Sequence, residues 1–217
     1  MEVKSFIGGF DKNFSYLVWC PDTRLCAVID PATEVTPIFE TIEKYDLILN
    51  KIFITHTHHD HIAFLEDYYK LNSTFKVVGF KNLEKDGFDN FISVGDMDCI
   101  SLGNQILICI HTPGHFPDSM CYWVKHDSII FTGDTLFVGR PGRTIGRKSS
   151  IKDLYNSLYN KIFKLHSDTK IYPGHHYGYT ETIPTKDNID TSNFLKCKNL
   201  EEFIKVMKEF EKNRLIS

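Results

Sequence analysis

The sequence predicts an α+β fold in which two β-sheets pack face to face and helices cover their outer sides. Short strand-like runs precede an amphipathic helix in each half of the chain, and no low-complexity linker separates the halves. Apolar residues make up 42% of the 217 residues, with 17 Phe and 10 Tyr among them, so the chain can bury a sizeable core. We therefore expect one domain over residues 1–217 that ends in a short helix.

The first half predicts strands with two helices between them. Strands are expected where Val, Ile, Phe and Tyr cluster in short runs, and helices where apolar residues recur every three or four positions. The elements in chain order are strands at 3–7, 14–20 and 25–30, a helix at 33–46, a strand at 51–55, a helix at 61–71 and a strand at 75–80. Thr33 or Thr36 would cap the first helix.

The second half repeats this order of strands followed by a helix. A strand-rich block covers 91–133, and the stretch "IKDLYNSLYNKIFKL" predicts a helix at 151–165. A short strand, "KIYPG", and a final helix at about 200–213 complete the chain.

Composition argues against a nucleic-acid or membrane partner. The formal net charge is −3 and the isoelectric point is near 6.4, so no basic field attracts a polyanion. No stretch approaches the roughly 20 apolar residues of a membrane span, and the start "MEVKSFIGGF" lacks the pattern of a signal peptide. We expect a cytoplasmic protein, and the oligomeric state is left open, a dimer included.

The six cysteines predict a reducing compartment. None forms a CxxC pair, and most lie in apolar, strand-like runs such as "ILICIHT" and "SMCYWV". We interpret them as small buried residues with free thiols.

The stretch "THTHHDHIAF", residues 55–64, holds four of the ten histidines within six positions. It follows an apolar run, "KIFI", that is typical of a buried strand. His56 and His58 are two apart, so both rings project to the same side of an extended segment. Asp60 and His61 follow as the chain turns into a helix. Imidazole and carboxylate are ordinary ligands of catalytic zinc, so the stretch predicts a metal site that needs further ligands from elsewhere.

Three further candidates stand at the ends of predicted strands. They are His115 in "HTPGHFPDS", Asp134 in "IIFTGDTLF" and His175 in "KIYPGHHYG". Each sits beside a glycine, which lets the backbone turn tightly and aim the side chain inward.

Together these pieces resemble the metallo-β-lactamase superfamily. A His-x-His-x-Asp-His loop is followed in order by a "TPGH" histidine, a "TGD" aspartate and a late "PGH" histidine, over residues 56–175. The stretches "TGDTLFVGRPGRT" and "YPGHHYG" are most similar to the glyoxalase II and persulfide dioxygenase branch. The resemblance implies a four-layer αββα sandwich with metals at one edge between the sheets.

The resemblance also implies a ligand set for two divalent ions, most often zinc. The first metal would be bound by His56, His58 and His115. The second metal would be bound by Asp60, His61 and His175. Asp134 would bridge both metals. A water between two metals is acidified to hydroxide at neutral pH and can attack an acyl carbon. Asp134 and Asp60 would be the catalytic carboxylates, with Asp60 orienting the nucleophile. A small thioester suits this chemistry, because a thiolate leaves without a strong general acid.

Two residues would hold the far end of a glutathione conjugate. The resemblance favours Arg143 for a substrate carboxylate and Tyr177 for a glutathione contact. Only about 40 residues follow His175, so we expect the C-terminal helical domain of the longer glyoxalase II enzymes to be absent or reduced to one helix.

Two alternatives to the hydrolase stay open. A mononuclear iron dioxygenase acting on glutathione persulfide would use His56, His115 and Asp134 alone, because two histidines and one carboxylate leave positions open for dioxygen. The other alternative is a metal-binding protein without catalytic activity, whose metals serve electron transfer or binding.

Overall fold

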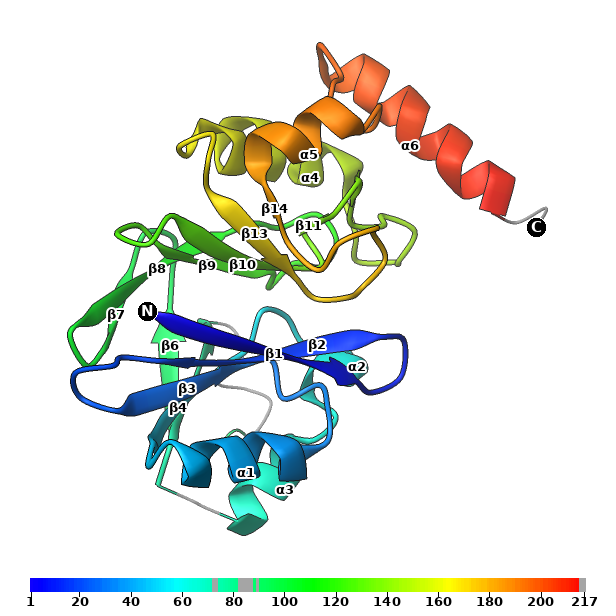
Figure 1. The fold of residues 1–217 in the computed structure, drawn as a ribbon. Helices are drawn as coiled ribbons and strands as arrows, with labels where there is room; N and C mark the ends of the chain where they lie inside the picture. The colour runs from blue at the N-terminus through cyan, green and yellow to red at the C-terminus, as the bar shows by residue number, and fades with distance from the viewer. Residues whose placement is uncertain (72–73, 82–87, 89, 215–217) are drawn as a thin grey trace.

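Two six-stranded sheets face each other in the computed structural model, and helices cover their outer sides (Figure 1). The structure describes residues 1–71, 74–81, 88 and 90–214. The helices are α1 (Val35–Lys44), α2 (His59–Ile62), α3 (Leu65–Leu71), α4 (Ile151–Asn160), α5 (Thr185–Thr191) and α6 (Leu200–Arg214). Figure 1 shows α1 and α3 outside the first sheet and α4, α5 and α6 outside the second. The αββα sandwich predicted from the sequence is confirmed.

The first sheet is built from the first half of the chain. Its strands, in spatial as well as chain order, are β1 (Glu2–Gly8), β2 (Asn13–Trp19), β3 (Leu25–Ile29), β4 (Ile48–Phe53), β5 (Lys76–Phe80) and β6 (Phe91–Val94). β1, β2 and β3 are antiparallel, and β3 to β6 run parallel. Parallel neighbours need a crossover, which α1 provides between β3 and β4 and α2 with α3 between β4 and β5.

The second sheet follows in the order β14-β13-β10-β9-β8-β7. Its strands are β7 (Cys99–Leu102), β8 (Gln105–His111), β9 (Met120–Val124), β10 (Ile129–Gly133), β13 (Lys170–Pro173) and β14 (Ile183–Pro184). β10 and β13 are parallel neighbours joined through α4. A separate hairpin of β11 (Leu136–Phe137) and β12 (Arg140–Pro141) lies between them in the chain.

The structure corrects some of the expected element boundaries. α1 begins after Glu34 without a side-chain cap, so the predicted capping by Thr33 or Thr36 is wrong. The helix expected over 61–71 is divided into α2 and α3, because the Phe64 N–H donates to the Pro31 carbonyl instead of continuing the helical ladder. The sequence did not predict α5 or the two-residue strands β11, β12 and β14.

The cysteines agree with their interpretation as small buried residues with free thiols. All six cysteines are free thiols, and five are buried, with only Cys99 exposed. In the part of the chain that the structure describes, no helix combines the length and the apolar composition needed to span a bilayer.

Two buried tyrosines reach across the sandwich and bind the strand ends of the opposite sheet. Tyr122 on β9 donates from its hydroxyl to the Ile54 carbonyl, at 2.6 Å, and Tyr16 on β2 donates to the Pro173 carbonyl, at 2.7 Å. Each acceptor lies two residues before a predicted metal ligand, His56 or His175. The sheets are therefore held in register at the edge that carries the ligands.

We predict that Tyr122→Phe lowers the melting temperature by roughly 2–12 °C. The variant leaves a buried carbonyl without its donor, which costs about 1–3 kcal/mol, and a chain of this size loses about 2–4 °C per kcal/mol. Differential scanning calorimetry measures the shift. Tyr179→Phe is the control, because Tyr179 is 66% exposed. Equal melting temperatures for the two variants would contradict a structural role of the Tyr122 hydroxyl.

Candidate metal centre

All seven predicted ligands gather at one edge of the sandwich, between the two sheets. The first sheet supplies residues that follow β4 or lie in α2, and the second sheet supplies residues that follow β8, β10 and β13. These are His56, His58, Asp60 and His61 from the first sheet, and His115, Asp134 and His175 from the second. Neither sheet alone brings together a complete set.

Six of these residues form two trios of converging donor atoms. In the first trio, Nδ1 of His58 lies 2.9 Å from Nε2 of His56 and 2.9 Å from Nε2 of His115. In the second trio, Nε2 of His175 lies 3.2 Å from Nε2 of His61 and 3.3 Å from Oδ2 of Asp60. The potential ligand atoms of each trio lie within 4.8 Å of one another.

The Asp134 carboxylate lies between the trios and faces both. Oδ1 lies 3.2 Å from Nε2 of His61 and 3.4 Å from Nε2 of His175, while Oδ2 lies 3.4 Å from Nε2 of His115. Among the described residues, none donates a hydrogen bond to the buried Oδ1 atom. A buried polar atom without a donor needs another partner, and imidazole nitrogens around a carboxylate oxygen are a donor set for a divalent metal.

Hydrogen bonds behind the imidazoles fix which nitrogen faces the centre. Nδ1 of His115 donates to the Arg143 carbonyl and Nδ1 of His175 to the Asp11 carbonyl, both at 2.8 Å. Nδ1 of His61 lies 2.8 Å from Oδ2 of Asp30. Because these acceptors hold a proton on Nδ1, each ring in its neutral form has an Nε2 lone pair that points inward, as metal ligation requires.

Asp30 and Asn13 belong to this arrangement, although the sequence interpretation did not single them out. Asp30 also accepts hydrogen bonds from the backbone N–H and the hydroxyl of Thr55, each at 2.7 Å. Asn13 donates to Oδ2 of Asp60 at 2.8 Å. Asp30 ends the strand-like run in "VIDPA", and this is the same position after a strand from which the ligands were predicted. The signal was present in the sequence.

Burial and neighbouring charge shift the histidine pKa values at the centre in opposite directions. Burial would lower the pKa of His61 and His175, but the Asp134 and Asp30 carboxylates raise the pKa of His61, and the Asp134 and Asp60 carboxylates raise that of His175 to about 9. Burial lowers the pKa of His56 well below its ordinary value and that of His58 to about 4, so both are neutral ligands at physiological pH. Burial alone would raise the pKa of Asp134, but the charges of His61 and His175 hold it below its usual range. The Asp134 carboxylate is therefore ionised, and positive charge beside it stabilises this form in its buried place.

Two glycines allow the close approach at the second trio. A Cβ atom on Gly174 would lie 2.5 Å from Oδ1 of Asp134 and 2.7 Å from Cε1 of His61. Gly133 has a φ of +47°, and a Cβ there would lie 2.5 Å from the Thr55 hydroxyl. The lack of space for a Cβ atom explains why glycine precedes Asp134 in "TGD" and His175 in "PGH".

The structure places Arg143 and Tyr177 beside the second trio, in a pocket of about 290 Å³. We call it the arginine pocket; it is lined by Asp11, Arg140, Arg143, Tyr177 and Phe210. The Tyr177 ring stacks on the His175 ring at a centroid distance of 4.8 Å, and its hydroxyl donates to Asp11. Arg143 holds Glu211 of α6 through Nε and Nη2, at 3.3 Å each. A substrate carboxylate would have to share or replace that partner, so the role of Arg143 remains a prediction.

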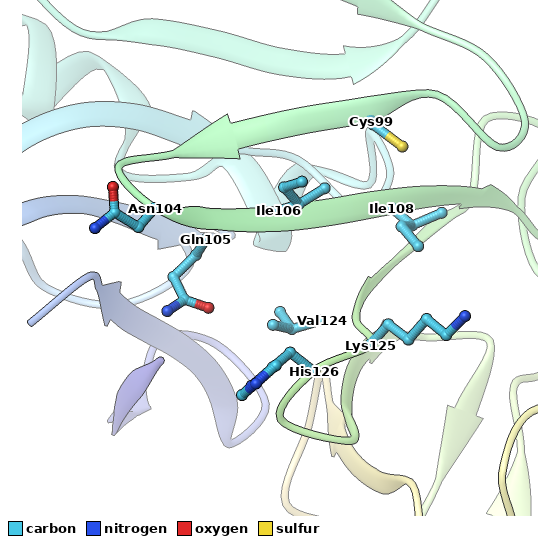
Figure 2. A pocket seen from close by; sticks show the side chains of 8 residues that line it. All are labelled: Cys99, Asn104, Gln105, Ile106, Ile108, Val124, Lys125 and His126. Atoms are coloured by element: carbon cyan, nitrogen blue, oxygen red, sulfur yellow. The ribbon is translucent and has the colours of Figure 1, made fainter.

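A larger pocket, of about 750 Å³, lies away from the metal centre on β7, β8 and β9 (Figure 2). Figure 2 shows Cys99, Ile106 and Ile108 on the antiparallel strands, with Lys125 and His126 on the neighbouring turn. None of the predicted ligands lines this pocket, and its one histidine has no carboxylate among the lining side chains. The candidate chemistry lies at the edge of the sandwich instead.

The edge of this αββα sandwich brings histidines and carboxylates from both sheets around one buried carboxylate. This combination of fold and site defines a class of metal-dependent proteins. The family model of the metallo-beta-lactamase superfamily matches residues 66–175, just over half of the 217 residues. The chain belongs to the metallo-beta-lactamase superfamily.

Individual relatives agree with this assignment. A hydroxyacylglutathione hydrolase of Francisella tularensis subsp. novicida is 37% identical over 179 residues, which cover 82% of this chain and 68% of that protein. A probable polyketide biosynthesis zinc-dependent hydrolase of Bacillus subtilis is 28% identical over 195 residues, with 89% and 86% covered. The crystal structure of ETHE1 from Myxococcus xanthus superposes with a TM-score of 0.86 and 29% identity, with 97% and 91% covered.

We predict that Asp134→Ala loses metal from both trios, because each carboxylate oxygen faces one of them. Asp60→Ala should lose metal only from the second trio, since Asp60 lies in that trio alone. Elemental analysis of dialysed protein, expressed as metal per chain, distinguishes the two results. A wild-type metal content in Asp134→Ala would show that this carboxylate does not bridge.

We predict that Asp30→Asn weakens metal binding about 10- to 100-fold, because the His61 ring loses a charged acceptor that fixes its orientation. Competition with a chelator of known affinity measures the change. Asp96→Asn serves as the control, since Asp96 pairs with Lys161 away from the centre. If both variants hold metal as tightly as the wild type, Asp30 does not support the ligand.

Proposed function

We propose that the chain is a metal-dependent hydrolase of small thioesters, with acyl-glutathione as the substrate class. The observation that carries the proposal is the Asp134 carboxylate, which faces a histidine trio with one oxygen and a mixed histidine and aspartate trio with the other. Such an arrangement fits two divalent ions, with zinc as the proposed metal. The similarity to a hydroxyacylglutathione hydrolase supports the glutathione conjugate, and the similarity to a zinc-dependent hydrolase supports the metal.

Hydrolysis joins the oxygen of water to the acyl carbon, breaks the carbon–sulfur bond and releases a carboxylate and a thiol. Bound metal ions lower the pKa of water and polarise the carbonyl. Asp60 is the chain's own group for orienting the water, because its side chain is 29% exposed while His61 and His175 are buried. Burial raises the pKa of Asp60, but the neighbouring imidazoles of His175 and His61 and the hydrogen bond from Asn13 outweigh this and keep the carboxylate ionised.

The arginine pocket would hold the glutathione part of the substrate. Glutathione carries two carboxylates, and the guanidinium groups of Arg140 and Arg143 line the pocket together. A guanidinium binds a carboxylate through two parallel hydrogen bonds. The aromatic ring of Tyr177 stacks on His175, so the pocket leads directly to the second trio.

A mononuclear iron dioxygenase of glutathione persulfide is the second candidate. The chain covers 91% of ETHE1, a protein of the persulfide dioxygenase branch, but only 68% of the Francisella hydrolase. In that case His56, His115 and Asp134 would hold one iron, and the second trio would not be needed for turnover.

Metal analysis and two assays on protein purified without oxygen separate the candidates. The hydrolase predicts about two zinc ions per chain and release of free thiol from S-lactoylglutathione, without consumption of oxygen. One iron per chain, together with oxygen uptake on glutathione persulfide and no thiol release, would overturn the proposal.

We predict that Arg143→Ala raises the KM for glutathione thioesters about tenfold to more than a hundredfold. The loss corresponds to one charge-assisted contact of about 1.5–3 kcal/mol. Metal binding should be retained, because His115 is held by the backbone carbonyl of Arg143 and not by its side chain. Arg143→Lys should recover only part of the loss.

Glu211→Gln is the matched control, because it removes the charge that pairs with Arg143 and keeps the arginine. If Arg143 binds substrate, Glu211→Gln leaves KM unchanged or lowers it. If Arg143 only supports α6, Glu211→Gln reproduces the loss seen in Arg143→Ala, and the predicted carboxylate contact is wrong.

A further inference from the structure

One pocket lies beside each trio of the metal centre. The arginine pocket lies beside the second trio, where Tyr177 stacks on His175. The other has a volume of about 600 Å³ and lies beside the first trio, where the Phe116 ring contacts the His58 ring at a centroid distance of 4.4 Å. Thr57 and His59, the two chain neighbours of His58, line this second pocket. A substrate bound across the centre therefore extends into both.

The second pocket has an apolar wall made by α2, α3 and Phe116. We call it the α2–α3 pocket. Ile62, Ala63, Leu65 and Tyr69 line it from the helices, and Ile62, Ala63, Tyr69 and Phe116 are only half-buried. Apolar side chains that stay partly open beside a catalytic centre gain from contact with an apolar ligand.

The charged residues of the α2–α3 pocket do not favour an anionic ligand. Among the described residues that line it, Glu66 and Lys148 carry opposite formal charges, which cancel. The Lys148 ammonium lies 5.6 Å from the centre of the Phe116 ring, and its alkyl chain extends the apolar wall. The arginine pocket, by contrast, is lined by two guanidinium groups and one carboxylate, that of Asp11, although Arg143 also pairs with Glu211. The two carboxylates of glutathione are therefore directed to the arginine pocket, and the acyl group to the α2–α3 pocket.

We propose that the α2–α3 pocket holds the acyl group of the thioester and selects apolar acyl chains longer than a three-carbon hydroxyacyl group. The inference rests on the proposed thioester hydrolase, and it names the substrate class of the same centre. A lactoyl group would occupy only a small part of the pocket, whereas a chain of about six carbons would reach from the first trio along Ile62 and Ala63.

Binding of S-alkylglutathiones, which are not hydrolysed, tests the pocket without any turnover. S-hexylglutathione should bind the metal-loaded protein roughly 30-fold more tightly than S-methylglutathione, as measured by calorimetry. The figure assumes about twofold per methylene over five methylenes, which is less than full burial gives, because the pocket is open on one side.

Ala63 offers a way to fill the pocket without disturbing the helix. It is the half-buried residue that follows α2, with a φ of −58° and a ψ of −31°, a conformation open to any L-residue. Ala63→Phe should reduce the hexyl-to-methyl affinity ratio to below fivefold, and Ala63→Leu should give an intermediate ratio. Ala63→Ser, the matched control, should keep the ratio within twofold of the wild type.

A wild-type ratio near one, or a ratio that Ala63→Phe does not change, would overturn the acyl pocket. Rates on S-acetyl-, S-lactoyl- and S-hexanoylglutathione distinguish this failure from a failure of the proposed function. The acyl pocket predicts the highest kcat/KM for the hexanoyl thioester. Hydrolysis of all three at equal kcat/KM contradicts the pocket and leaves the hydrolase intact. Chain-length-dependent binding without hydrolysis of any of them contradicts the hydrolase and leaves the pocket intact.

Discussion

The buried Asp134 carboxylate is the constraint on which the rest of the structure depends. An ionised carboxylate removed from water costs several kcal/mol unless positive charge and donors surround it. Here imidazoles from both sheets face its two oxygens, and Oδ1 accepts no hydrogen bond from the described residues. A divalent cation held by each trio would satisfy these atoms at once. Metal binding would then stabilise this edge as well as supply its chemistry.

This constraint explains why ligands, sheets and glycines are coupled. Four ligands come from the first sheet and three from the second, so packing of the sheets and assembly of the centre are one event. Tyr122 and Tyr16 bind the carbonyls two residues before His56 and His175, each from the opposite sheet. Gly174 leaves room for Asp134 Oδ1, and Asp30 orients His61. A substitution of Tyr122, Tyr16, Gly174 or Asp30 should weaken metal binding, although none of these four residues is a predicted ligand.

Much of this could be predicted from the sequence, for identifiable reasons. The strands and long helices follow from apolar periodicity. Three of the predicted ligands, His115, Asp134 and His175, follow from their places at strand ends next to glycine, and the other four follow from the histidine-rich stretch after β4. The break between α2 and α3 could not be predicted, because it depends on a hydrogen bond from Phe64 to Pro31, which is distant in the chain. The ion pair of Arg143 with Glu211 could not be predicted either, because it joins a loop to the last helix and its two residues are distant in the chain. Asp30 also follows a strand, as the predicted ligands do, but it lies outside the motif. It contacts His61 and would act on a metal only through that histidine.

Anomalous X-ray scattering from crystals of the zinc-loaded protein, collected on both sides of the zinc absorption edge, tests the central claim most directly. The account predicts two anomalous peaks in each chain: one among His56, His58 and His115, and one among Asp60, His61 and His175. Asp134 should contact both. A single peak, or two peaks of which only one touches Asp134, would contradict the account of this carboxylate as the bridge on which the centre is built.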